Sequence, residues 1–515
     1  MNDMEDVLCV LDDARKKGVD LWLEEGELRY RAPKGRLTRE EIERLRKYKG
    51  QIASLLNTMT ASAPALSEQK IRGRFDRAPL AFSQLAHWRL HCLARRRVVR
   101  GVSSATTLRG PLSIEALKKA LAETVRHHDA LRTAIVVCDG VPYQEVRPSC
   151  DDELTVRDLT SLSESLRHTE ATRLIDEYLA EKIDVTIEPL FKVWLLRIRD
   201  EEHILVLAME HIISDGVSGN ILLRDIFLVY VQVLEGKNLA LAEVPIQFTD
   251  YAARQREAHA AWIASHEPYW SERLKGARRL RVPSGRAPRS VEEPGWGLLP
   301  IRIDSGLTSE LRRCCKEKRT TLVMCVFAAY VAFFLRRCNA EEAVFLFHTD
   351  GRFIPATQAA IGYFAFRLYL RLRLPVHGTF DDLIGQVTKE YCNAHEHADY
   401  WWMESQEVPP EFTQNSCFNW VIRDFDSFSV ESPEGTIVCS DFPFEQRTLP
   451  DLQVDAEPIV GLYECGDEIH GLLQFSFKSL SFESSERLAG GFLSFIKALL
   501  RLPESDLRHI PLMNQ

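Results

Sequence analysis

The sequence predicts an α/β protein in which a small N-terminal module precedes a much larger body. The chain has 515 residues, of which 45% are hydrophobic, so it can bury a large core and is too long for one ordinary domain. From Ala78 to the end, apolar strand-like runs alternate with amphipathic helices. Residues 58–75 are predicted to be a linker, because TMTASAPALS is small, polar and aperiodic.

The composition disfavours several classes of protein. A net charge of −9 argues against general nucleic-acid binding, and no apolar run approaches the ~20 residues of a membrane span. The first residues, MNDMEDVLCV, carry acids where a secretory signal carries Lys or Arg. The 12 cysteines include no CxxC pair, which favours reduced thiols. We therefore expect a cytoplasmic protein that binds neither nucleic acid nor membrane.

Residues 1–57 are predicted to form a self-contained module of helix, hairpin and helix. Apolar and polar residues alternate from Val19, and Gly26 turns the chain into a second strand. Thr38 and Glu41 have the spacing of a helix capping box. A two-stranded hairpin leaves an edge that can accept an added strand or an acidic peptide. The basic candidates for that contact are Arg29, Arg31, Lys34 and Arg36. A structural cap on the larger body is the alternative.

This module resembles the TubC-like β-hairpin docking domains of nonribosomal peptide and hybrid polyketide assembly lines. The resemblance covers essentially all of residues 1–57 and lies in patterning more than in invariant residues. It implies that the module captures a short linear motif at the end of an upstream acyl or peptidyl carrier protein.

A candidate catalytic segment follows the apolar run of residues 203–209, which is predicted to be a strand buried on both faces. The next residues are EHIISDG, and an amphipathic helix begins beyond the glycine. The imidazole of His211 is suited to accepting a proton near neutral pH. Asp215 is too close in sequence to be assumed its partner and could equally brace the loop through an arginine. On spacing alone, a histidine there is more often a structural residue.

This segment resembles the HHxxxDG motif of condensation domains in nonribosomal peptide synthetases. Other stretches match the family in the same order and extend the resemblance over about residues 76–515. They are PLAFSQ at 79–84 with Trp88, RHHDALRT at 126–133, IQFTDYA at 246–252 with Gln255, Gly351-Arg352, IGYF at 361–364, and the closing stretch 475–512.

The resemblance implies a V-shaped pair of lobes, each similar to chloramphenicol acetyltransferase, over residues 76–250 and 251–515. His211 would be the catalytic histidine that deprotonates or positions the acceptor as it attacks an acyl thioester. Asp215 would be structural with Arg352 as its partner, and Gly216 would leave room for the phosphopantetheine arm of a carrier protein.

Three departures from the family pattern concern the acceptor. Glu210 stands where the family has its first histidine, and a buried carboxylate there needs a partner and could shift the pKa of His211. Phe366 and Arg367 replace the usual Asn and Thr of the GxFxNT pattern. The later HQDxPF segment survives only as HADYWW at 397–402. These changes indicate an acceptor other than a standard aminoacyl carrier thioester, either a small molecule or a carrier-bound group.

The sequence lacks the motifs of several other kinds of catalytic or metal site. His395 and His397 are too close together for a zinc site without further ligands, and the sequence contains no GxSxG elbow, no phosphate loop and no recognisable carrier or adenylation segment. We therefore expect a monomer without a metal or a bound cofactor of its own. It would act in trans and release a chain as an ester or amide. The alternatives are an epimerisation domain of the same fold and a catalytically silent platform that recruits another enzyme.

Overall fold

A computed structural model of the chain provides the fold. It describes most of residues 10–53, and then residues 77–93, 102–148, 154–180, 183–186, 189–277, 280, 282, 295–352, 354–398, 415–421, 427–442, 447–449 and 456–512. The expected linker of residues 58–75 lies outside these ranges.

The N-terminal module contains the predicted hairpin. Strand β1 (Asp20–Glu24) pairs antiparallel with β2 (Glu27–Arg31), and the two make a sheet of their own. Helix α2 (Arg39–Lys47) begins at the predicted capping box of Thr38 and Glu41. Val10, Leu45, Tyr48 and Ile52 form the core of the module. Within the described residues, each strand of this hairpin therefore keeps one edge without a partner strand.

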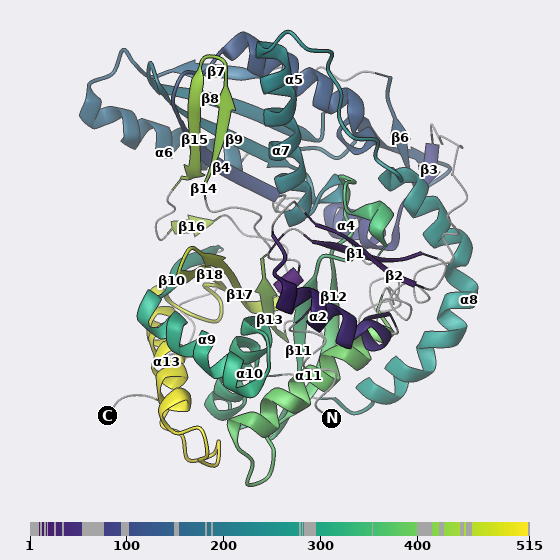
Figure 1. The fold of residues 1–515 in the computed structure, drawn as a ribbon, viewed down its shortest axis with the longest axis vertical. Coiled ribbons are helices and arrows are strands. Elements are labelled where there is room, and N and C mark those ends of the chain that lie inside the picture. Colours follow the sequence, from purple (N-terminus) through teal and green to yellow (C-terminus); the bar gives the residue numbers. More distant parts are fainter. Residues whose placement is uncertain are drawn as a thin grey trace.

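A six-stranded mixed sheet forms the first lobe, in the upper half of Figure 1. Its strands, in spatial order, are β14 (Ser427–Ser432), β15 (Gly435–Asp441), β4 (Val102–Arg109), β9 (Glu202–Met209), β8 (Phe191–Arg199) and β7 (Thr155–Asp158). One face packs against α5 (Ile114–His127) and α7 (Gly216–Leu234), and the other against α6 (Glu164–Ala180). Strand β9 is buried on both faces, as its apolar run predicts.

The first lobe also contains a small three-stranded sheet. It consists of β3 (Arg77–Pro79), β6 (Val141–Val146) and β5 (Thr133–Cys138). Helix α4 (Phe82–Leu93) follows β3 and lies against the segment after β9. The PLAFSQ motif therefore begins at the end of β3 and runs into the first turn of α4.

A seven-stranded sheet forms the second lobe, in the lower half of Figure 1. Its strands, in spatial order, are β12 (Phe366–Arg373), β11 (Glu342–Thr349), β13 (Asn415–Trp420), β17 (Ala456–Cys465), β18 (Glu468–Ser476), β10 (Trp296–Ile303) and β16 (Arg447–Leu449). One continuous core joins this sheet to α9 (Ser305–Lys318), α10 (Leu322–Arg337), α11 (Phe380–Glu396) and α13 (Phe482–Arg501).

Two segments connect the lobes. Helix α8 (Phe248–Leu274) runs from the first lobe alongside the second, at the right edge of Figure 1. The β14–β15 hairpin belongs by sequence to the segment expected to form the second lobe. It nevertheless extends the sheet of the first lobe, where β15 pairs with β4 from Val438 opposite Arg109 to Asp441 opposite Thr106. The sheet of the first lobe is therefore not built from one continuous stretch of chain.

One described helix, α7, is long and apolar enough to cross a membrane, and half of its apolar window is buried inside the protein. Helices α9 and α10 pass the same test only as a pair, which is bent by 103° between them. All three helices contribute buried side chains to the cores of the two lobes.

Candidate active site

The candidate catalytic segment lies where β9 gives way to α7. Strand β9 ends at Met209, a single 3₁₀ turn covers His211–Ile213, and α7 begins at Gly216. The Asp215 carboxylate accepts a hydrogen bond from the Ser218 backbone N–H at 2.9 Å and so caps the helix. An N-cap of this kind stabilises a helix by about 1 kcal/mol. The short turn between a buried strand and a capped helix fixes the backbone on both sides of His211.

The His211 imidazole is held in one orientation by its own loop. Nδ1 lies 2.8 Å from the Ser214 carbonyl oxygen. A carbonyl can only accept, so Nδ1 carries the proton and Nε2 is left with its lone pair. The Tyr363 ring lies against the imidazole, with centroids 4.3 Å apart. Burial, followed by the charge of His87, lowers the pKa of His211 to about 4. His211 is therefore neutral at pH 7 and able to accept a proton.

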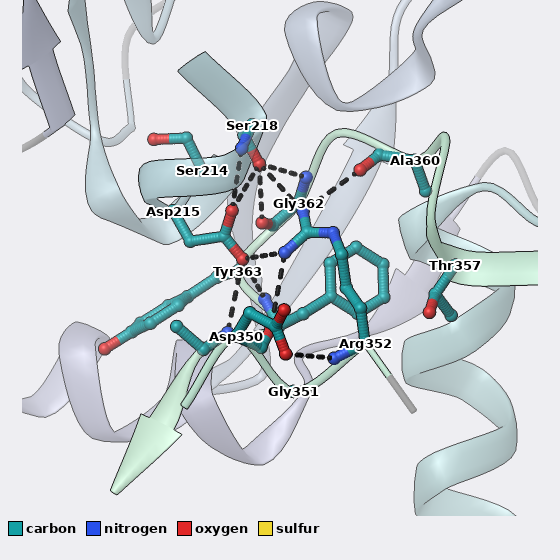
Figure 2. A network of polar contacts seen from close by, with 12 residues as sticks. Ser214, Asp215, Ser218, Asp350, Gly351, Arg352, Thr357, Ala360, Gly362 and Tyr363 are labelled. Atoms are coloured by element: carbon teal, nitrogen blue, oxygen red, sulfur yellow. Dashed lines mark hydrogen bonds and ion pairs between the residues drawn. The ribbon is translucent and has the colours of Figure 1, made fainter. Parts of the chain in front are cut away.

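Asp215 lies at the centre of a buried polar network (Figure 2). Its Oδ1 accepts hydrogen bonds from the backbone and hydroxyl of Ser218. Its Oδ2 lies 2.6 Å from Arg352 Nη1 and accepts from the backbone N–H groups of Phe364 and Ala365 at 3.0 and 3.2 Å. The expected ion pair with Arg352 is thus present. Because each carboxylate oxygen has at least two donors, the Asp215 carboxylate is satisfied although it is buried. Within the described residues, the buried Nε of Arg352 has no hydrogen-bond partner.

The connection between β11 and β12 supplies the other half of this network. Ser218 Oγ lies 3.0 Å from the Gly362 carbonyl oxygen and accepts from the Gly362 N–H at 3.1 Å. Arg352 donates to the Ala360 carbonyl at 3.1 Å, and its guanidinium lies 4.5 Å from the centre of the Phe364 ring. Gly351 has φ +65°, and a Cβ there would lie 2.0 Å from the Phe364 carbonyl oxygen, so only glycine fits. The motifs around Gly351 and Gly362 are therefore held against the start of α7.

Two residues beside His211 were not singled out from the sequence. His87 of α4 faces Glu210, with Nε2 and Oε2 3.4 Å apart and both side chains buried. Gln84, one turn earlier, donates to the Ile212 carbonyl at 2.9 Å. The sequence indicated a partner for Glu210, because a buried carboxylate requires one. That partner, His87, lies on α4 three residues after the PLAFSQ motif.

Gly216 and the acceptor-side candidates lie in different surroundings. Gly216 is exposed, and a Cβ there would meet no atom within 4 Å. Phe366 is buried in the core of the second lobe, close to Gly351. Arg367 is half-buried and stands opposite His348 on β11. Of the two replaced motif residues, only Arg367 is therefore partly exposed to solvent.

The docking candidates are only partly described. Arg29 on β2 is exposed and lies 3.8 Å from Glu27, and Arg36 is exposed just after the hairpin. Arg31 belongs to β2, although its side chain is outside the described part of the chain, and Lys34 lies wholly outside it.

The two histidines that the sequence indicated to be unsuited to a zinc site have different surroundings. His395 is buried at the end of α11, and His397 pairs through Nδ1 with Nδ1 of His266 on α8 at 2.8 Å. In the part of the chain that the structure describes, no group of three or more His, Cys, Asp or Glu side chains could hold a metal ion.

Comparison with known proteins identifies both parts of the chain. Residues 75–515 match the condensation domain model, and residues 9–57 match that of the TubC N-terminal docking domain. A linear gramicidin synthase of Brevibacillus parabrevis is 26% identical over 480 residues, which are 90% of this chain but only 9% of that protein. Bacitracin synthase 2 of Bacillus licheniformis is 23% identical over 516 residues, which cover 99% of this chain and 19% of that one. The chain therefore spans only a small part of the length of these relatives.

Two solved structures share the fold. The SgcC5 protein of Streptomyces globisporus superimposes with a TM-score of 0.71 at 22% identity, covering 83% of this chain and all of that one. The X-domain from teicoplanin biosynthesis, solved in complex with OxyB, has a TM-score of 0.71 at 18% identity and covers 87% of this chain and 98% of that one. The expected two-lobed α/β fold is confirmed by these matches. The chain belongs to the condensation domain family, whose members are acyltransferases that form amide or ester bonds, and it carries a TubC-type docking domain in front.

Proposed function

We propose that the chain transfers an acyl group from the phosphopantetheine arm of a carrier protein to a hydroxyl or amine, with His211 as the base. The observation that carries the proposal is the hydrogen bond from His211 Nδ1 to the Ser214 carbonyl at 2.8 Å. This bond leaves Nε2 as the proton acceptor, and the lowered pKa of about 4 keeps it unprotonated at neutral pH.

The reaction follows from that geometry. Nε2 of His211 accepts the proton of the acceptor O–H or N–H as the oxygen or nitrogen attacks the thioester carbonyl carbon. The C–S bond then breaks, and the proton returns from Nε2 to the departing pantetheine thiolate. The new bond is an ester or an amide, with no change in oxidation state. A base placed in this way contributes about 10²–10⁴ in rate, and holding both substrates in place contributes more.

The remaining site residues have supporting roles in this proposal. Asp215 and Arg352 hold the two lobes in register around His211. Exposed Gly216, with open space where a side chain would be, is the point where the pantetheine arm passes. The enzyme binds no cofactor of its own, because the arm belongs to the partner.

The acceptor is proposed to be a free small molecule, so that transfer releases the chain from the assembly line. The half-buried Arg367, in place of the family's threonine, supports an altered acceptor side. SgcC5 was solved in complex with a naphthyl ethanediol, a molecule with two hydroxyl groups, which supports a hydroxyl acceptor in this fold.

Delivery of the donor is proposed to depend on the N-terminal module. The match to the docking domain family, the strand edges of the β1–β2 hairpin and exposed Arg29 and Arg36 support capture of an acidic carrier segment. In this proposal the enzyme is a monomer that meets its carrier in the cytoplasm.

The test is an incubation of the full chain with acyl-loaded carrier protein and a panel of amines and alcohols, followed by mass spectrometry of the products. Wild type is expected to form one class of ester or amide, and His211→Ala to lose at least 10²-fold in rate. Equal transfer by His211→Ala would refute the role of the base. Deuterium exchange into the acyl chain without transfer would identify an epimerisation domain instead.

A recruitment platform is the second candidate. The X-domain shares this fold and was solved in complex with OxyB, and Glu210 departs from the family motif. A platform would transfer nothing to any acceptor while binding a second enzyme, and His211→Ala would leave that binding unchanged.

A further inference from the structure

A buried pair of an acid and an imidazole, Glu210 and His87, lies near the proposed base. The side chains of His87 and Glu210 are 5% and 6% exposed, and His87 Nε2 lies 3.4 Å from Glu210 Oε2. A carboxylate removed from water costs several kcal/mol unless a partner compensates it. The proposed base does not require either residue for its own hydrogen bond, which goes to Ser214. The pair is therefore an addition to the site described above.

The position of His87 is fixed by the same helix that braces the loop. Gln84, three residues earlier on α4, donates to the Ile212 carbonyl at 2.9 Å. The His87 ring centroid lies 5.8 Å from that of His211 and 6.1 Å from that of Tyr363. Tyr363 in turn lies against His211 at 4.3 Å. The three rings form one cluster, and Glu210 contacts it through His87.

We propose that His87 is a positioning residue of the active site that acts through Glu210. The two buried side chains act as one unit beside His211, so that the effect of removing one depends on whether the other is present. The inference rests on the proposed role of His211 as the base.

The charges around His211 indicate how the pair of His87 and Glu210 affects the pKa of His211. Among the described residues, His87 from α4 and Tyr363 from the β11–β12 connection lie against its imidazole, and Asp215 at the start of α7 acts on it through its charge. Glu210 precedes His211 in the chain and faces His87. The charge of His87 lowers the pKa of His211, and the charge of Asp215 raises it. Asp215 is already compensated by Arg352. Removing His87 takes away the imidazole that faces Glu210, so the Glu210 carboxylate then favours protonation of His211.

The test combines His87→Gln, Glu210→Gln and the double variant. The readouts are the pH dependence of kcat/KM and an NMR titration of the His211 imidazole in histidine-labelled protein. His87→Gln is expected to move the acid limb of the profile and the titration of His211 upward by about one to two pH units, a loss of roughly tenfold or more in kcat/KM at the acid end. Glu210→Gln is expected to raise neither the acid limb of the profile nor the titration midpoint of His211. In the double variant, both quantities are expected to lie close to their wild-type values.

A matched control is the buried pair of His128 and Asp225, which are 2.8 Å apart with side chains 0% and 6% exposed. His128→Gln should lower the unfolding temperature without moving the acid limb. If His87→Gln behaves in the same way, with no shift in either readout, the pair has only a packing role and the proposal is wrong. If His87→Gln does not fold but the double variant does, the coupling is supported directly.

The NMR titration separates this inference from the proposed function. Should the wild type transfer no acyl group, the base assignment fails. The titration of His211 in wild type and in the three variants still decides whether Glu210 and His87 act as one unit.

Discussion

Arg352 Nη1 lies 2.6 Å from Asp215 Oδ2, and the two side chains are 0% and 1% exposed. Asp215 caps α7 of the first lobe, and Arg352 belongs to the connection between β11 and β12 of the second. The same carboxylate accepts two backbone N–H groups of that connection, from Phe364 and Ala365. This single ion pair therefore links the lobes four residues from His211, and its loss should affect stability and catalysis together.

Arg352→Ala is expected to lower the free energy of unfolding by about 3–5 kcal/mol, because it leaves the Asp215 carboxylate buried without its cation. Chemical denaturation followed by circular dichroism measures this effect. Asp215→Ala should cost a similar amount. The double variant should cost clearly less than the sum, because no unpaired charge remains.

The control for this cycle is Arg302→Ala. Arg302 and Glu468 are 2.6 Å apart, but the arginine is 67% exposed, so solvent and salt screen the pair and little change is expected. If the losses of unfolding free energy in Arg352→Ala and Asp215→Ala simply add in the double variant, the two residues do not stabilise each other as an ion pair.

The sequence predicted the local part of this site and, of its tertiary contacts, only the pair of Asp215 and Arg352. The succession of buried strand, His211, Asp215 and Gly216 follows from a continuous stretch of chain, since strand burial and helix capping are local properties. Arg352 could be named only because the order of motifs resembles a family. Gln84 lies in the quoted PLAFSQ motif and His87 three residues after it, but their contacts could not be predicted, because α4 comes against residues 210–212 only in the folded chain. The same reason explains the β14–β15 hairpin, whose partner strand β4 lies more than 300 residues earlier.

The acceptor-side residues show that matching a family motif does not establish which side chains reach the site. Phe366 and Arg367 are neighbours in the sequence, and both were predicted to lie on the acceptor side. Alternation along β12 turns Phe366 into the core of the second lobe and leaves Arg367 half-buried. Which of them contacts the acceptor stays a prediction, and the strand geometry favours Arg367.

Enlarging Gly216 should block the donor without unfolding the protein. A Cβ at this position meets no atom within 4 Å, and Ala or Leu has a higher helix propensity than Gly. We expect Gly216→Ala to be nearly neutral and Gly216→Leu to lower kcat/KM for a carrier-bound donor by about 10²-fold, by displacing the pantetheine arm. The unfolding temperature should not fall in either variant.

Steady-state kinetics with acyl carrier as the varied substrate measures this effect, and the unfolding temperature serves as the control. If Gly216→Leu is fully active, the arm passes elsewhere. If it is inactive and unstable, the space beside Gly216 is filled in the working enzyme by something other than the arm.

Reversing the charge of the docking module should weaken use of the carrier but not of a free thioester. In Arg29→Glu with Arg36→Glu, both exposed cations become acids. We expect KM for carrier-bound donor to rise by about tenfold at low salt, and the difference from wild type to shrink as salt screens the attraction. The activity with a small pantetheine thioester should be unchanged.

The matched control is Lys118→Glu with Lys119→Glu on α5, two exposed lysines of the main body whose reversal changes the net charge by the same amount. It should leave KM for the carrier unchanged. Equal effects of both double variants would mean that only net charge matters, and that the module is not the docking site.

The pH dependence of catalysis should report His211 alone. Its pKa of about 4 lies below the ordinary value of 6.5, mainly because burial disfavours the charged imidazole. Above the folded-state pKa the imidazole is neutral and accepts a proton, so kcat/KM should be flat from pH 7 down to about 5. It should fall toward pH 4 and lose a further tenfold for each unit below that. The rate measurements require a donor thioester that is stable over this range.

The stability of the fold should follow a different curve. The depressed pKa means that the unfolded chain binds a proton between pH 6.5 and 4 where the folded chain does not, so His211 makes the unfolding free energy decrease as pH falls through that window. Burial lowers the pKa of His395 to about 4 as well, so both histidines contribute to this loss. His395→Gln should therefore reduce the pH dependence of stability and leave the acid limb of kcat/KM in place. An acid limb that moves in His395→Gln, or that stays near pH 6.5 in wild type, would mean that His211 is not the group that titrates during catalysis.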